Sequence, residues 1–259
     1  MLSLMRSECY QIRKMLSVKI TFMIILVASV IFSFQTFQPD YVDYMQSNDR
    51  MYELYGGGGL CSVMEDSAAC LLLASLFAGF LISAGFENRT IQTAVSCGKS
   101  RTKVYLAKMF SYIMVVTLLS MVYWFGSNTA VFLKNGLGSS TVVGNLNRLP
   151  CIAGMVIAAS IAYASLYAIC GVVAFFSRKV GMTMGICFLG ILFGGRMVTL
   201  LLPEAAINWI NLTPLGLYQR VLTLDVSAEA ILQTCLLGIL WTTAICCIGW
   251  WKFKRTGLK

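Results

Sequence analysis

The sequence has 259 residues, of which 58% are hydrophobic and only 12% are charged, and its formal net charge is +9. Ordinary soluble domains have about 25% charged residues, so this composition argues against a soluble protein. The chain contains no histidine, which excludes haem ligation by imidazole, the H-E-x-x-H metalloprotease motif and Ser-His catalysis. We therefore do not expect an enzyme.

The apolar residues are gathered in segments long enough to cross a membrane. A transmembrane helix needs about 20 mostly apolar residues. Six segments qualify: 18–37, 68–86, 104–125, 152–176, 180–202 and 230–251. The first begins too far along the chain for a simple signal peptide, so we expect it to be retained. The predicted fold is an all-α membrane protein with six transmembrane helices in a single domain over residues 1–259.

Residues 1–15 precede the first apolar segment and mix apolar with basic side chains. Leu2, Met5, Cys9 and Ile12 recur at spacings of three and four, which is typical of one face of a helix. We expect an amphipathic interfacial helix on the membrane surface. The alternative is a frayed tail whose periodicity arises by chance.

Residues 38–67 and 126–149 are predicted to be external loops. The first contains four consecutive glycines, residues 56–59, and no Gly-Lys-Ser/Thr follows directly. A flexible hinge is therefore favoured over a phosphate-binding loop. The second loop is rich in Gly, Ser and Asn, residues that are typical of turns and loops.

Residues 86–108 lie between the second and third apolar segments. They include several charged side chains, but their apolar residues recur at helical spacing. Residues 90–97 can form a short helix with Ile91, Ala94 and Val95 on one face. Gly98 is placed to end this helix as a C-cap glycine. This amphipathic pattern is typical of an element that docks a soluble partner. The alternative is a charged loop that has no partner.

The fourth and fifth apolar segments are separated by only three residues, 177–179, so we expect antiparallel neighbours. The fifth carries five glycines, which allow close helix packing in lipid. It also carries Arg196, near the predicted outer boundary. Arg196 can snorkel to water; the alternative is a role in a transport pathway, because charges inside a membrane are costly and often functional.

Residues 203–229 are too hydrophobic for a solvated loop and are interrupted by Pro214 and Gly216. They predict an external apolar insertion of short helices in the outer interface. Trp209 and Tyr218 are candidate interfacial anchors.

The basic residues indicate the orientation. With the N-terminus in the cytoplasm, 15 of the 20 Lys and Arg residues fall on the cytoplasmic side. The positive-inside rule therefore places both termini in the cytoplasm. Because the positive charge follows the topology, a nucleic-acid partner is not expected.

The ten cysteines do not form a recognisable framework. Six lie inside apolar segments, and no C-x-x-C occurs, so neither a metal site nor a redox motif is predicted. Cys61 and Cys151 could both face outward, which leaves a pairing between them open.

The segment 86–108 resembles the cytoplasmic loop of ABC-2-type transporter permeases. The matching residues are Glu87-Asn88-Arg89-Thr90-Ile91, Gly98, Ser100-Arg101 and Tyr105-Leu106-Ala107-Lys108. This sequence has Arg89 where many family members have glycine before the threonine. The order of elements is similar too: an amphipathic N-terminal segment, six crossings, and an apolar insertion with Thr213-Pro214 before the last helix.

The resemblance implies that two permeases pair, as two copies of this chain or as this chain with a related one, above two ABC ATP-binding subunits. Residues 90–98 would be the coupling helix. The residues that the resemblance assigns to ATPase coupling are Glu87, Arg89, Thr90, Ile91, Val95, Gly98, Ser100 and Arg101. Of these, Glu87, Arg89 and Arg101 would form ion pairs at the rim. ATP and Mg²⁺ would bind the separate ATPase, so no cofactor is expected on this chain.

The implied function is a permease of an ATP-driven exporter in the plasma membrane. Its substrate would be amphipathic or hydrophobic, such as a peptide antibiotic, a lantibiotic or a drug. One alternative is a non-transporting membrane scaffold or regulatory subunit that recruits a cytoplasmic partner through the same loop. An ion channel or secondary carrier is disfavoured, because no apolar segment holds a clear pair of acidic residues.

Overall fold

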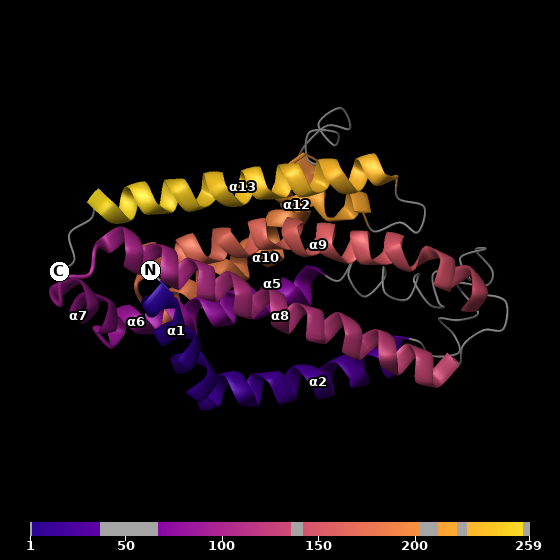
Figure 1. Cartoon of the computed structure of the whole chain (residues 1–259), viewed down its shortest axis with the longest axis horizontal. Helices are drawn as coiled ribbons and strands as arrows, with labels where there is room; N and C mark the ends of the chain where they lie inside the picture. The colour runs from indigo at the N-terminus through magenta and orange to yellow at the C-terminus, as the bar shows by residue number, and fades with distance from the viewer. Residues whose placement is uncertain (1, 37–66, 136–141, 202–211, 222–226, 256–259) are drawn as a thin grey trace.

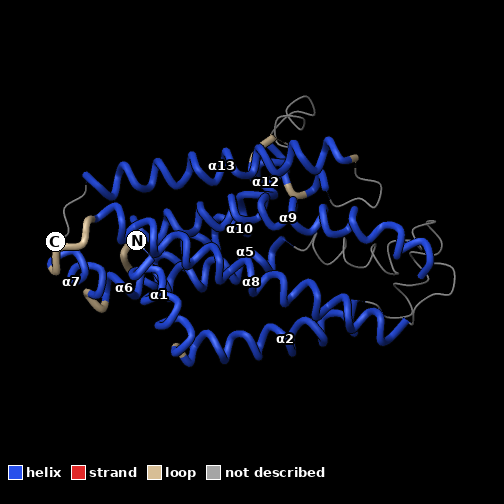
Figure 2. Tube along the Cα trace, viewed as in Figure 1, coloured by secondary structure: helices blue, strands red, loops and turns tan. Residues whose placement is uncertain are grey.

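A computed structural model describes residues 2–36, 67–135, 142–201, 212–221 and 227–255. All regular elements within these ranges are helices (Figure 2). In chain order they are α1 (Leu2–Lys14), α2 (Leu16–Thr36), α5 (Ser67–Phe77), the π-helical segment η2 (Ala78–Ser83), α6 (Ala84–Glu87), α7 (Thr90–Ser96), α8 (Arg101–Asn135), α9 (Val142–Ser177), α10 (Val180–Leu201), α12 (Pro214–Leu217), the 3₁₀ turn η3 (Gln219–Val221) and α13 (Ala228–Arg255).

Four helices in the described part of the chain are long and apolar enough to cross a membrane. They cover Ala68–Glu87, Arg101–Ser127, Ala153–Ser177 and Ala228–Arg255. A fifth is possible if Met5–Lys14 and Val18–Ile31, which meet at a bend of 64°, are one broken span. The stretch Val180–Gly190 of α10 is apolar but shorter than a span. The helices are compatible with a multi-pass membrane protein, but the structure supports four or five of the six predicted spans.

The loop predicted over residues 126–149 is largely wrong. α8 continues to Asn135 and α9 begins at Val142, so only residues 136–141 separate them, outside the described ranges. Residues 129–135 include Ala, Leu and Lys, which favour helices. The loop signal came mainly from the glycines and serines of the short interval between the two helices.

α9 is the central helix of the bundle. It contacts α5, η2, α8, α10, α12 and α13, whereas α2 contacts mainly α8. Figure 1 shows the consequence: α13 and α2 run along opposite edges, with α9 and α8 between them. Ala158, Ala159, Ala162 and Ala174 are buried, and small side chains of this kind let helix backbones approach closely in lipid.

Gly249 of α13 is tightly enclosed by two neighbouring helices. A Cβ at this position would overlap the hydroxyl of Tyr105 on α8 and lie 2.7 Å from Val172 Cγ2 on α9. The Tyr105 hydroxyl cannot move freely, because it donates a 3.0 Å hydrogen bond to the carbonyl of Cys246. Gly249 therefore sets the distance of α13 from both neighbours.

The π-helical segment η2 is buried between α9 and α10. The Ser83 hydroxyl contacts Thr183 Oγ1 of α10 at 2.6 Å and donates to the Ala174 carbonyl of α9 at 3.3 Å. Just before η2, the Ala74 carbonyl accepts a 2.9 Å hydrogen bond from Tyr112 of α8. These polar contacts fix a non-α segment inside an apolar bundle, where unpaired polar groups are costly.

The short helix α7, the helix α1, the turn between α9 and α10 and the last residues of α13 lie at one end of the bundle (Figure 1). We call it the α7 end. α7 is the only described helix that connects two candidate spans at this end without belonging to either.

We predict that Gly249→Ala destabilises the protein by about 1–3 kcal/mol, as overpacking of a core does, and lowers its unfolding midpoint in detergent. Gly185→Ala in α10 is the matched control, because, apart from its chain neighbours and the backbone of its own helix, no described atom lies within 4 Å of the position its Cβ would take. Equal midpoints for the two variants would show that α13 is not held at this distance.

Candidate functional site

α7 starts directly after a left-handed turn. Arg89 has a φ of 55°, and its carbonyl accepts hydrogen bonds from the backbone N–H of Thr93 at 2.9 Å and from the Thr93 hydroxyl at 3.0 Å. Thr90 Oγ1 donates to the Gly85 carbonyl at 3.0 Å, which ties the new helix to α6. Glycine adopts this left-handed conformation at little steric cost, whereas a residue with a side chain, such as Arg89, is strained by it.

α7 ends in a Schellman motif. The N–H of Gly98 donates to the Val95 carbonyl at 3.0 Å, and the N–H of Lys99 donates to the Ala94 carbonyl at 3.3 Å. Gly98 has a φ of 83°, a conformation that costs an L-residue about 1–2 kcal/mol and glycine very little. Gly98 thus stops the helix where the sequence pattern placed its end.

The apolar face of α7 is turned into the bundle. Ile91 is 1% exposed and lies against Gly85, where an added Cβ would be 3.2 Å from Ile91 Cδ1. Ala94 and Val95 are partly buried against the same core. Ile91, which the resemblance assigns to ATPase coupling, is therefore covered by its own chain and holds α7 in the bundle.

The outer face of α7 is polar and exposed. Arg89, Thr93, Ser96 and Cys97 follow one another at helical spacing and are all exposed. Lys99 and Ser100 extend this surface toward α8. We call these six residues the α7 surface.

Two of the predicted rim residues bind within the chain. Glu87 Oε1 accepts a 2.9 Å hydrogen bond from the backbone N–H of Val180, the first residue of α10. Carboxylates are favoured at helix N-termini, where backbone N–H groups are unpaired. Arg101 Nη1 donates to the Lys254 carbonyl near the end of α13 at 3.4 Å. Glu87 and Arg101 thus connect the segment around α7 to α10 and α13.

An aromatic cluster lies beneath α7. Phe86, Tyr105, Phe175 and Phe253, one each from α6, α8, α9 and α13, are all buried, and their ring centroids are 4.6–6.3 Å apart where they touch. The Arg178 guanidinium lies 5.6 Å from the centroid of Phe86, a cation–π distance. This cluster was not predicted from the sequence. The signal that could have revealed it is an aromatic residue at or just beyond this end of four of the apolar segments.

α1 is joined to α8, next to α7, by an ion pair. Lys108 Nζ of α8 lies 2.7 Å from Glu8 Oε2, and both side chains are largely buried. A cavity of about 100 Å³ separates α1 from α7; it is lined by residues of α1, α7 and α8, among them Glu8, Thr90 and Ile91. α7 is therefore not tightly packed on its α1 side.

Other candidate residues lie outside the described side chains. Arg196 belongs to α10, but its side chain is not described. The possible pair Cys61 and Cys151 and the candidate anchor Trp209 are likewise not described. Tyr218, also expected at the interface, is buried and stacks on Tyr163 of α9 at 4.9 Å. In the described ranges, no three His, Cys, Asp or Glu side chains gather as a metal site would require.

Comparison with known proteins adds no relative: no family model matches this chain, and no curated protein matches it.

We predict that Arg89→Gly slows amide hydrogen exchange in α7 relative to Arg89→Ala. Both changes remove the charge, but only glycine relieves the left-handed backbone, by about 1 kcal/mol or about fivefold in exchange rate. Hydrogen exchange with mass spectrometry measures it. Faster exchange in the glycine variant would mean that Arg89 is not left-handed in the folded protein.

Proposed function

We propose that this chain is the membrane subunit of an ABC-2-type exporter and that the α7 surface receives the ATP-binding subunit. The observation that carries the proposal is the two-sided character of α7. Its apolar face fixes it in the bundle through Ile91, and its polar face, including Arg89 and Thr93, is exposed. A helix held in this way can be displaced by a partner only together with the helices to which it is joined.

The contacts of the α7 segment support a route for such a displacement. α7 connects α6 to α8 along the chain. Glu87 adds a hydrogen bond to α10, and Arg101 adds one to α13. A push on α7 would therefore reach α6 and α8 along the chain, and from these two helices it would reach α10 and α13 through the hydrogen bonds of Glu87 and Arg101.

The sequence also fits a transporter in which a separate subunit binds and hydrolyses ATP. The chain has no G-x-x-x-x-G-K-[ST] motif, the loop that cradles nucleotide phosphates in P-loop NTPases. In the proposal, ATP and Mg²⁺ bind the separate subunit. A second permease, identical or related, completes the transporter, and an amphipathic peptide or drug is the substrate.

In the proposed topology the α7 end faces the cytoplasm of the cell, both termini are cytoplasmic, and α2 and α10 complete six crossings of the plasma membrane. The support is the charge at this end: Lys99, Arg101, Arg178 and Lys254 all belong to it. Positive charge is concentrated on cytoplasmic segments.

The exposed thiol of Cys97 tests the orientation. We predict that a membrane-impermeant maleimide labels this thiol only after cells are permeabilised, with Cys97→Ala defining the background. Labelling of Cys97 in intact cells would place α7 outside and overturn the proposed docking.

We predict that Thr93→Trp blocks docking of the ATP-binding subunit by steric overlap at the centre of the α7 surface. The binding loss should be about tenfold or more, the 1.4 kcal/mol scale of a disrupted interface core. The measurement is co-purification with a co-expressed neighbouring gene product that carries a P-loop, together with its ATPase activity.

The matched control is Thr129→Trp. Thr129 is also exposed, and its hydroxyl also bonds to the carbonyl four residues earlier, in α8. If the Thr93→Trp variant binds the ATP-binding subunit as well as the unaltered protein does, the α7 surface is not part of the interface. If Thr93→Trp abolishes binding but the partner bound to the unaltered protein hydrolyses no ATP in any state, the scaffold function is favoured instead.

A further inference from the structure

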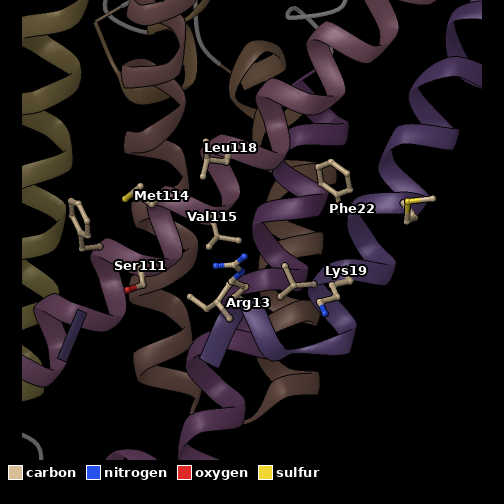
Figure 3. A pocket seen from close by; sticks show the side chains of 11 residues that line it. Arg13, Lys19, Phe22, Ser111, Met114, Val115 and Leu118 are labelled. Carbon is tan, nitrogen blue, oxygen red and sulfur yellow. The ribbon is translucent and has the colours of Figure 1, made fainter. Parts of the chain in front are cut away.

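A groove of about 490 Å³ lies where α1, α2 and α8 meet (Figure 3). Its walls are almost entirely apolar. Phe22 and Met23 come from α2, and Phe110, Met114 and Leu118 come from α8. These side chains are each about 40–60% exposed, so the groove opens on the outside of the bundle, toward the proposed lipid.

Two cations line the same groove at the bend between α1 and α2. Arg13 is in the last turn of α1 and Lys19 is in the first turns of α2. Figure 3 shows Arg13 and Lys19 at one end of the groove, below the labelled side chains of Val115 and Leu118 in this view. Neither side chain has an ion pair with a residue that the structure describes; Glu8, the acidic residue of α1, pairs with Lys108. The groove is therefore apolar along its length and positively charged at one end.

A buried hydroxyl also lines the groove. Ser111 is 4% exposed, and its Oγ has no hydrogen-bond partner within the described ranges. Other buried serines of the bundle behave differently: Ser120 and Ser160 donate to the carbonyl four residues earlier. An unpaired buried hydroxyl is unfavourable unless a group outside the chain accepts a hydrogen bond from it.

We propose that this groove binds one molecule of an anionic phospholipid. The lipid phosphate lies between Arg13 and Lys19, one acyl chain lies along Phe22, Met114 and Leu118, and the Ser111 hydroxyl donates to an ester oxygen. Cations beside a membrane surface favour anionic headgroups. A free phosphate would leave the apolar walls uncovered, and a neutral lipid would leave the two cations uncompensated.

The site has a structural consequence that does not depend on the transporter proposal. The lipid would join α1 to α2 and α8 at a bend of 64°. α1 in turn borders the cavity beside α7. The bound lipid would therefore hold α1 against the α7 end.

The test is native mass spectrometry of the full-length protein in detergent, titrated with phosphatidylglycerol or phosphatidylcholine of identical acyl chains. We expect tighter binding of phosphatidylglycerol, and a loss of about fivefold for each of Arg13→Gln and Lys19→Gln, or about 1 kcal/mol per cation. Lys14→Gln is the matched control: it removes the same charge from the same turn, but Lys14 lies over the Tyr10 ring, 4.8 Å from its centroid, and does not line the groove.

Three further measurements distinguish a bound lipid from other kinds of ligand. Met114→Trp should fill the groove and weaken the binding of both lipids. Ser111→Ala should also weaken the binding of both, without changing the preference for the anionic headgroup. Inorganic phosphate should not compete at millimolar concentration. Unfolding midpoints without added lipid show that each variant is folded.

Equal affinity for the two lipids, or an unchanged affinity in both the cation variants and Met114→Trp, would overturn the proposal. Competition by inorganic phosphate would also overturn it, by reducing the site to an anion site.

Discussion

The packing of four aromatic rings, Phe86, Tyr105, Phe175 and Phe253, determines the geometry of the α7 end. Each ring comes from a different helix, and each is buried. α7 is only seven residues long and connects α6 to α8 through short turns. Its position therefore depends on how far apart those two helices are held, and the rings beneath it set that distance.

α7 differs from the usual amphipathic docking helix in the face that it exposes. In many complexes an amphipathic helix offers its apolar face to a groove of the partner. α7 instead buries Ile91 in its own bundle and exposes Arg89, Thr93 and Lys99. Recognition on this surface would rest on hydrogen bonds and charge at a fixed position, which favours specificity over buried apolar area.

Sequence reasoning succeeded where the determining interactions are local. The helix at Thr90–Ser96 and its stop at Gly98 depend on residues within one or two turns, so spacing predicts them. The bond from Val180 to Glu87 joins residues 93 positions apart, and no local pattern reveals it. Burial of Tyr218 on Tyr163 likewise requires α12 to fold back onto α9.

The helix ends near residues 135 and 142 were missed for a different reason. Glycine and serine weaken a helix on average, but neighbouring helix-forming residues can extend it almost to the breakers themselves. The count of membrane crossings is harder still, because α10 and the bent pair of α1 and α2 lie close to the length at which a helix can span.

Arg89 and Arg178 are the two non-glycine residues with positive φ in the described chain, at 55° and 54°. They belong to the turns that follow α6 and α9. Glycine would form either turn with less strain. By retaining arginine, the chain keeps a positive charge at two reversals of direction and accepts less stable turns there.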